Sequence, residues 1–547
     1  MGNLSRRGGR RLAAVVASCL LVVSAPAAAG AATPTPTALA AVSTLDTLVP
    51  APVSARAEPG QDFRLTPGTA IVVPRGAGGA GEVHEVREVA DLLAADLRPA
   101  TGFPLSVATD SGRRGNTITL RLTRDARGIG AEGYRLDVAR SGVTLEATGA
   151  AGLRNATQTL RQLLPPAIEA ESRQDVAWTV PGAHIVDQPR YAYRGAMLDV
   201  ARYYFPPDVV HRFIDQLGSY KVNRLHLHLT DDQGWRLQVD SWPRLATHGG
   251  STQTGGGPGG YYTKAEYAAI VEHARERGIT VVPEVDMPGH TTAALSSYGE
   301  LTCDGVAPPL YTGYDVGFSS LCLGTPTTAR FVDDVLREVA ALTPGEYIHI
   351  GGDEAAATTP EADYTAFMAM ATATAAKYGK KVIGWNSALA SGSPFGAGAV
   401  AQYWYPWPDD ATARDATARG AKLIMSPAHR AYLDMKYTAT EPLYGQAWAG
   451  YVEARNAYEW NPDTTVNGVP ASAVLGVEAT LFTQITPDEK SVQFMLYPRL
   501  PELAEVAWTP LSGQSWDRLR TRLPAQAQRW DAWGVNYYRS PQIPWVG

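Results

Sequence analysis

The sequence predicts an α/β protein in which a small α+β domain precedes a (β/α)8 TIM barrel. Three observations support this prediction. Residues 61–188 mix strands and helices, eight short apolar strands recur from residue 189 onward, and polar side chains gather where those strands end. Repeated strand–helix units close into a barrel, and barrel enzymes carry their chemistry at the carboxyl ends of the strands.

The first 32 residues have the layout of a signal peptide. Four arginines precede an apolar run and a small-residue stretch, APAAAGAA. SRRGGRR would also suit twin-arginine export, and the sequence Val-Ala-Ser-Cys at 16–19 resembles a lipoprotein cleavage site. We favour plain secretion, because the apolar run continues past Cys19, where a lipidated cysteine is normally followed by a polar linker. Residues 33–60, rich in Ala, Pro and Thr without a hydrophobic period, are predicted to be a linker of little structure.

Residues 61–188 are predicted to form the N-terminal α+β domain. TAIVVP, NTITLRL, GYRLDVA and GVTLEAT have the composition of strands, and a Ser-Gly turn at 141–142 makes the last two a hairpin. HEVREVADLLAADLR and GLRNATQTLRQLL have the period of amphipathic helices. This region shows no catalytic constellation.

Residues 189–547 are predicted to form the catalytic barrel. In chain order the strands are GAMLDV, RLHLHLTDD, TVVPEVD, YIHIGGDE, KVIGWN, VAQYW, LIMSP and VLGVEATLF. Helical stretches such as YTKAEYAAIVEHARERG and TARFVDDVLREVAAL lie between several of them. The polar or aromatic residues at the strand ends are Asp231, Asp232, Asp286, His290, Asp353, Glu354, Trp385 and Trp404.

Charge limits the partners of the protein. The chain carries a formal net charge of −6, and the leader holds four arginines and no acid, so the mature protein carries −10. An acidic protein is a poor partner for nucleic acid, and no later segment has the ~20 apolar residues needed to span a bilayer. We expect a secreted monomer without a nucleic-acid partner, and without a membrane partner once the signal is removed.

The cysteines indicate an oxidising compartment. If Cys19 leaves with the leader, only Cys303 and Cys322 remain. We predict that they form a disulfide; the alternative is two free buried thiols. Two cysteines are too few for a structural zinc site, and the sequence shows neither a metal-ligand cluster nor a phosphate loop, so no cofactor is expected.

The sharpest candidate site is HIGGDE, where a strand runs through two glycines into Asp353 and Glu354. An isolated Asp-Glu pair is usually a solvated turn, but this one ends a barrel strand. Retaining glycosidases of the usual kind hold two carboxylates ~5–5.5 Å apart on opposite sides of the bond, which neighbouring residues do poorly. They suit substrate assistance better: one acid protonates the leaving oxygen, while the other holds a 2-acetamido group that attacks the anomeric carbon.

With YRGAMLDVAR, LHLHLTDDQGWR and PEVDMPGH in the same order, HIGGDE resembles glycoside hydrolase family 20, the β-N-acetylhexosaminidases, most of all secreted streptomycete enzymes. The resemblance implies that Glu354 is the general acid/base and that Asp353 orients the acetamido nitrogen as an oxazolinium intermediate forms. His290, Asp231 and Asp286 correspond to the supporting network around the acid, with a proton-relay role for the histidine.

The resemblance also implies the substrate-binding residues. Arg202 would bind the 3- and 4-hydroxyls of the sugar, since its planar fork of donors suits vicinal oxygens. Tyr432 would bind the acetamido oxygen and Asp434 the 6-hydroxyl. Trp385 and Trp404 would wall the acetamido methyl group; the alternative for each tryptophan is a packing role in the core.

The sequence departs from the family around the sugar. Where streptomycete members read Leu-Trp-Thr-Glu, residues 481–484 read Leu-Phe-Thr-Gln. Phe482 can still stack on a sugar but has no indole N–H, and Gln484 replaces a charged acceptor by a neutral amide. Tyr203 follows the sugar-binding arginine, where a histidine is common. Trp448 is expected to shape the leaving-group side.

Three hypotheses follow. The first is a retaining exo-β-N-acetylhexosaminidase that acts on chitin oligomers or on glycans with a terminal N-acetylhexosamine. The second is a member with altered specificity, releasing a disaccharide such as lacto-N-biose or accepting a modified sugar. The third is an inactive carbohydrate-binding protein, against which retention of both acids argues.

Overall fold

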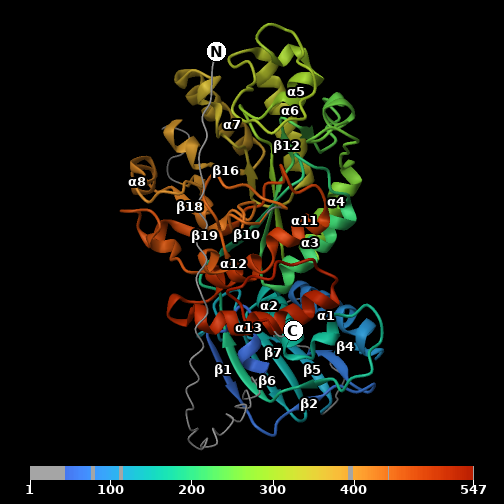
Figure 1. The fold of residues 1–547 in the computed structure, drawn as a ribbon. Helices are drawn as coiled ribbons and strands as arrows, with labels where there is room; N and C mark the ends of the chain where they lie inside the picture. Colours follow the sequence, from blue (N-terminus) through green and yellow to red (C-terminus); the bar gives the residue numbers. More distant parts are fainter. Residues whose placement is uncertain (1–43, 75–79, 110–114, 392–397, 442, 546–547) are drawn as a thin grey trace, which may run out of the picture. The chain divides into compact units, whose positions relative to one another are not determined.

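Eight parallel strands form a closed barrel in the order in which they occur in the chain (Figure 1). The structure is a computed structural model and describes residues 44–74, 80–109, 115–391, 398–441 and 443–545. The barrel strands are β10 (Tyr193–Asp199), β11 (Arg224–His228), β14 (Thr280–Glu284), β15 (Tyr347–His349), β16 (Lys381–Trp385), β17 (Val400–Tyr403), β18 (Lys422–Met425) and β19 (Val474–Ala479). Each of the eight predicted segments contains one of them, so the predicted barrel is confirmed.

The barrel strands form where short apolar runs can be buried on both faces. All seven residues of β10 are buried, for example, as expected of a parallel strand between a packed interior and covering helices. In the part of the chain that the structure describes, the helices after β10 are α3 (Pro207–Ser219), α4 (Lys264–Glu276), α5 (Thr292–Ser297), α6 (Pro326–Leu342), α7 (Glu361–Lys377), α8 (Ala411–Ala418), α9 (Ala428–Ala431), α10 (Ala454–Tyr458), α11 (Glu489–Leu496), α12 (Arg499–Trp508) and α13 (Trp516–Ala532).

Local sequence explains where several helices begin. Thr263 and Glu266 make a reciprocal capping box at the start of α4. Thr325 caps α6, whose Phe331, Val335 and Val339 recur at helical spacing and are buried. A short hairpin, β12 (Thr230–Asp231) with β13 (Gly234–Trp235), follows β11 and places Asp231 on the rim.

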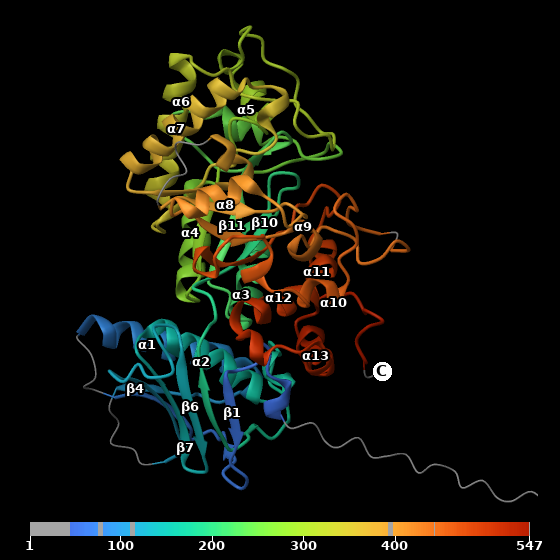
Figure 2. The ribbon, with the colours of Figure 1, turned by 90° about the vertical axis from the view of Figure 1, so that its left-hand side faces the viewer.

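The N-terminal domain is a seven-stranded sheet in the order β1-β9-β6-β7-β5-β3-β4. Its elements are β1 (Ser54–Ala57), β3 (Ala70–Val73), α1 (Ala80–Thr101), β4 (Val107–Thr109), β5 (Thr117–Leu122), β6 (Tyr134–Ala139), β7 (Gly142–Ala147), α2 (Ala150–Leu163) and β9 (Ala183–Asp187), with β2 (Phe63–Arg64) paired to β8 (Thr179–Val180). Helices α1 and α2 cover one face (Figure 2). The predicted hairpin is the antiparallel pair β6–β7.

The predicted linker is wrong for residues 44–57. They form a 3-10 turn at Thr44–Thr47 and the edge strand β1, which pairs with β9, a strand that the sequence analysis missed. All four side chains of β1 are exposed, so main-chain hydrogen bonds hold the strand and no hydrophobic pattern marks it. The predicted signal peptide and residues 33–43 lie outside the described residues.

Buried ion pairs join the N-terminal domain to the amino ends of the barrel strands. Arg194 of β10 contacts Glu132 at 2.6 Å, and Lys221, just before β11, contacts Asp187 at 3.2 Å. Breaking such a pair is costly because it leaves a buried charge uncompensated. The domain therefore lies at the end of the barrel opposite the strand ends that carry the predicted site.

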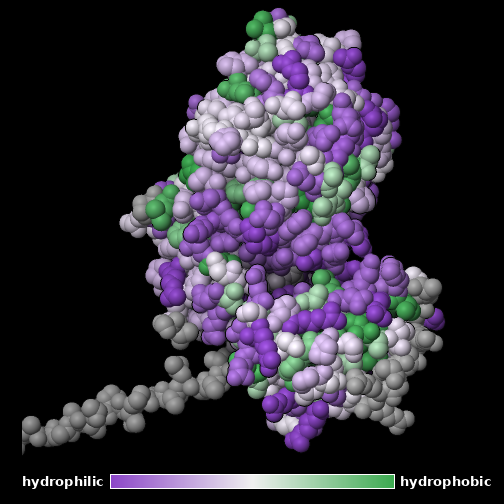
Figure 3. Space-filling view, turned by 90° about the vertical axis from the view of Figure 1, so that its right-hand side faces the viewer, coloured by the Kyte–Doolittle hydropathy of each residue, from purple (hydrophilic) through white to green (hydrophobic). Residues whose placement is uncertain are grey.

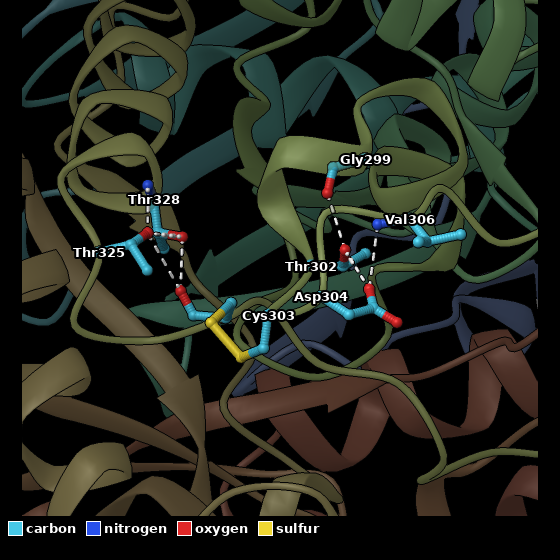
Figure 4. The surroundings of a disulfide bond; sticks show 8 residues. Gly299, Thr302, Cys303, Asp304, Val306, Thr325 and Thr328 are labelled. Atoms are coloured by element: carbon cyan, nitrogen blue, oxygen red, sulfur yellow. Dashed lines mark hydrogen bonds between the residues drawn. A yellow bond between two sulfur atoms is a disulfide. The ribbon is translucent and has the colours of Figure 1, made fainter.

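The predicted disulfide between Cys303 and Cys322 is present (Figure 4). Thr328 of α6 donates to the Cys322 carbonyl at 2.6 Å, and Asp304 accepts from the Val306 amide at 3.0 Å. The bond therefore closes a loop that packs against α6 at the rim.

The molecular surface is predominantly polar on the face shown in Figure 3, where hydrophobic side chains occur in small, separate patches. In the described part of the chain, no helix combines the length and the apolar character needed to cross a bilayer.

Candidate active site

A cavity of about 550 Å³ opens where the carboxyl ends of the barrel strands meet. Its lining residues are Arg202, Asp231, Asp286, His290, Tyr314, Val316, Asp353, Glu354, Trp404, Pro406, Trp407, Tyr432, Asp434, Gln446, Trp448, Phe482 and Gln484. The structure thus brings together all the predicted site residues except Trp385. The segments after β10, β11, β14, β15, β17, β18 and β19 each contribute at least one of them.

Backbone conformation places the acid pair after β15. Gly351 has a φ of +69°, and a Cβ there would lie 1.6 Å from Asp286 Oδ1, so only glycine lets that carboxyl approach. Glu354 and His290 are themselves left-handed, with φ of +50° and +56°. Non-glycine residues in this region cost of order 1–3 kcal/mol each and cluster at functional sites.

His290 faces both acids. Its Nε2 lies 3.3 Å from Glu354 Oε2 and 3.6 Å from Asp353 Oδ2, while its Nδ1 lies 3.2 Å from Asp231 Oδ1. Burial lowers the pKa of His290, but Asp231 and Asp353 raise it further, so the net pKa is well above the ordinary histidine value. The ring is therefore an imidazolium at neutral pH.

The neighbouring carboxyls differ in charge state. Burial raises the pKa of Asp353 to about 6, with His290 opposing and Glu354 adding to the rise. Burial, and next the charge of Asp353, raise the pKa of Asp286 well above its usual range. Near neutral pH, Asp353 is thus ionised and Asp286 is a neutral acid.

Arg202 is locked to the floor of the pocket by two carboxylates. Its Nη2 lies 2.7 Å from Asp231 Oδ2, and its main-chain amide donates to Asp199 Oδ1 at 3.1 Å. Asp199 also accepts from the Thr483 amide at 2.9 Å, so it ties the arginine to the segment that carries Phe482. The guanidinium carbon lies 5.0 Å from the centre of the Phe482 ring.

Aromatic side chains form the walls. Trp448 stands edge-on to both Trp404 and Tyr432, at ring-centre distances of 5.7 and 5.8 Å. Phe482 lies 5.7 Å from Tyr432. Trp385 lies beneath them: it is buried 5.8 Å from Phe482, and its indole N–H donates to Glu284 at 2.9 Å. Its role as a wall for the acetamido methyl stays a prediction.

Several buried polar atoms of the pocket have no hydrogen-bond partner among the residues that the structure describes. They are Trp404 Nε1, Asp353 Oδ1, Asp434 Oδ1, Gln484 Oε1 and Arg202 Nε. Burial raises the pKa of Asp434 to about 7, so its carboxyl is partly neutral near pH 7. Because buried polar groups are normally satisfied, such a convergence marks a place for a polar ligand.

Some of these groups also lie close enough to hold a metal ion. Ligand atoms of His290, Asp353 and Glu354, and of His226, Glu284 and His349, lie within 4.8 Å of one another. Imidazolium–carboxylate contacts already balance the charge in these clusters, so the chemistry of the donor set does not call for a cation.

Sequence reasoning missed two groups of residues. Tyr314, Val316, Pro406, Trp407 and Gln446 also line the pocket, and they lie in loops without periodicity. His226, His228 and Glu284 lie under the pocket; the first two alternate in RLHLH, which would have indicated two polar side chains facing the barrel interior.

The fold and the site define a barrel hydrolase that uses carboxylates on a ligand bound among aromatic side chains. Comparison with known proteins narrows this class. Residues 191–511 match the catalytic domain of glycosyl hydrolase family 20, and residues 46–188 match domain 2 of the same family. The chain therefore belongs to glycoside hydrolase family 20, as its motifs predicted.

Relatives agree along nearly the whole chain. A beta-N-acetylhexosaminidase of Cellulomonas fimi is 43% identical over 501 residues, which cover 91% of this chain and 97% of that protein. The solved GH20 beta-N-acetylhexosaminidase of Streptomyces coelicolor A3(2) is 52% identical, with a TM-score of 0.87 over 94% of this chain and all of that one. A mutant Streptomyces plicatus beta-hexosaminidase, solved with the product GlcNAc, is 52% identical with a TM-score of 0.86 over 92% of this chain and 98% of its own.

Proposed function

We propose that the protein is a retaining exo-β-N-acetylhexosaminidase that works by substrate-assisted catalysis. The observation that carries the proposal is that Asp353 and Glu354 face the same imidazolium of His290, at 3.6 and 3.3 Å. Two acids on one side of a pocket suit protonation of a leaving group and support of a neighbouring acetamido group. They do not suit attack from the opposite face.

The other carboxyls of the pocket are poor nucleophiles. Asp231 is held by Arg202 and His228, Asp286 is neutral, and the pKa of Asp434 is raised to about 7 by burial. A nucleophilic oxygen supplied by the substrate removes the need for any of them. In the first step Glu354 gives its proton to the leaving oxygen, the glycosidic bond breaks, and the acetamido oxygen bonds to the anomeric carbon.

Asp353 stabilises the positive charge that develops on the acetamido nitrogen, because its ionised oxygen is buried and unpartnered. In the second step water attacks the anomeric carbon and Glu354 takes up its proton. The ring oxygen–carbon bond of the oxazolinium breaks, and the product retains its configuration.

The remaining pocket residues would fix the sugar. Arg202 would bind the 3- and 4-hydroxyls, Asp434 the 6-hydroxyl and Tyr432 the acetamido oxygen, with Trp404 walling the methyl group. Arg202 and Asp434 are almost fully buried. A sugar held there through these hydroxyls has no position left for further glycan, so it is the terminal unit.

A second candidate is a family member with altered specificity. Gln484 offers an unpartnered amide oxygen at the pocket floor, where it would contact a sugar hydroxyl without a charge. Neutral hydrogen bonds are about half as strong as charge-assisted ones, so the preference at that hydroxyl is relaxed. We further propose that the enzyme acts outside the cell as a monomer, as the leader and the acidic charge suggest.

Hydrolysis of 4-nitrophenyl β-N-acetylglucosaminide by wild type and Glu354→Gln, with and without a thiazoline analogue of the oxazolinium, tests the proposal. We expect turnover that the thiazoline blocks and the substitution abolishes for natural, poor leaving groups. Turnover unaffected by thiazoline would contradict substrate assistance. A folded wild type without turnover on this substrate, but active on larger glycans, would favour the second candidate.

A further inference from the structure

A single buried carboxylate, Glu284, joins four side chains beneath the pocket. Its Oε1 accepts from the Trp385 indole N–H at 2.9 Å and lies 2.9 Å from His349 Nδ1. Its Oε2 lies 2.9 Å from His226 Nε2 and also contacts His228 Nδ1. These partners come from β11, β15 and β16, while Glu284 ends β14 and is fully buried.

A chain of charged contacts leads from this carboxylate into the pocket. His228 Nε2 lies 2.8 Å from Asp231 Oδ2. The same Asp231 oxygen lies 2.7 Å from Arg202 Nη2, and its other oxygen lies 3.2 Å from His290 Nδ1. His290 in turn faces Glu354. One side chain, Asp231, thus holds both the sugar-binding arginine and the histidine beside the acid pair.

The position of His228 explains how Asp231 is held. Each ring nitrogen of His228 faces a carboxylate, so both must carry a proton to donate. Burial lowers the pKa of His228, but Glu284 and Asp231 raise it well above the ordinary value. His226 lies between Glu284 and Glu478 in the same way, and its pKa is raised to about 9.

We propose that Glu284 is a positioning residue for the reaction: by holding His228 as an imidazolium, it fixes Asp231 between Arg202 and His290. This inference rests on the proposed function, since it concerns the groups assigned there to sugar binding and proton transfer. Without the Glu284 charge, His228 needs only one proton, and Asp231 loses a cationic partner.

Other charged groups around His228 act in both directions. Asp231 follows its own strand, Asp199 ends β10 and Asp286 follows β14, and each carboxylate that is ionised favours the imidazolium. Arg202 Nη1, 3.2 Å from His228 Nε2, opposes it. Glu284 is the first-ranked charge among those that raise the His228 pKa, so its removal should shift the balance most.

The test is the pH profile of Glu284→Gln, which keeps the side-chain shape and removes the charge. An opposite charge in contact shifts a pKa by about 1 to 3 units. We expect the alkaline limb of kcat/KM to move to lower pH by about one unit or more, with KM raised and kcat lowered together. Glu478→Gln is the matched control: Glu478 is equally buried in the same layer and contacts His226, Tyr193 and Gln402.

A role confined to packing would lower activity in both variants without moving the limb of either, and that result would overturn the proposal. An equal shift in Glu478→Gln would overturn it too, since the limb would then not report His228. Glu284→Asp, which retains the charge, should keep the limb closer to that of the wild type than Glu284→Gln does.

A second measurement does not depend on turnover or on the folding of Glu284→Gln. Nitrogen-15 NMR of histidine side chains in the wild-type protein, with the His228 signal assigned by its loss in His228→Asn, reports the protonation of the ring. We expect both His228 nitrogens to be protonated at pH 8, well above the ordinary pKa of about 6.5. A neutral ring there would refute the inference even if the enzyme is active, and a doubly protonated ring would support it even if the proposed substrate is wrong.

Discussion

Replacing His290 by asparagine should move the acidic limb of the kcat/KM profile toward neutral pH. The limb is assigned to Asp353, which must be ionised to stabilise the oxazolinium. Burial raises its pKa to about 6, and the His290 cation, 3.6 Å away, opposes that rise. Removing the cation leaves burial and the Glu354 charge unopposed, so the pKa of Asp353 rises further.

The size of the shift follows from these contacts. With a pKa of about 6, roughly a tenth of Asp353 is ionised at pH 5 and roughly nine tenths at pH 7, so wild-type kcat/KM should rise about tenfold over this range. A facing opposite charge is worth about 1 to 3 pKa units, which places the limb of His290→Asn near pH 7 or above. The overall rate should also fall, by about 10²- to 10⁴-fold if the histidine serves in proton transfer.

The assay is initial-rate hydrolysis of an aryl β-N-acetylglucosaminide across the pH range, fitted for the limb separately from the maximum. Asp434→Asn is the control, because Asp434 is a second buried acid of the pocket whose pKa is raised, to about 7. Its substitution should raise KM and leave the acidic limb in place. If the limb of His290→Asn stays at that of wild type or moves to lower pH, the assignment to Asp353 is refuted.

Three further predictions concern specificity and stability. Gln484→Glu should lower KM for N-acetylglucosaminides by about five- to tenfold, because a charged acceptor replaces a neutral one; unchanged KM would mean that residue 484 does not contact the sugar. Trp407, 52% exposed at the pocket mouth, should stack on the leaving sugar, so Trp407→Ala should lower kcat/KM on chitobiose about three- to tenfold relative to a methyl glycoside; an equal effect on both would contradict a leaving-group role. Cys303→Ser with Cys322→Ser should lower the free energy of unfolding by about 3 kcal/mol, the loop-closure value for a short loop, measured by denaturant titration against the reduced wild type.

Local patterns were enough to predict most of the fold. The eight barrel strands are short apolar runs, and amphipathic spacing marks helices such as α4 and α6, because burial on a strand or on one helix face imposes a period along the chain. Strand β1 escaped prediction for the same reason: its four side chains are exposed, so its sequence carries no period.

The candidate site was predicted from residues at strand ends, since the carboxyl ends of all barrel strands meet at one rim. The glycines before Asp353 also had a readable purpose, which the close approach of Asp286 to Gly351 now explains. The loop residues Tyr314 and Trp407 could not be placed in the same way, because loop positions follow no period.

The sequence by itself determined the family, the barrel and the identity of the acid pair, because these depend on residue types at fixed local spacing. Only the tertiary structure decided that Asp353 and Glu354 share one imidazolium and that Glu284 stands behind it. Those contacts join residues of different strands, and their distances depend on how the strands register around the barrel. The charge of each buried group is then set by its neighbours in space.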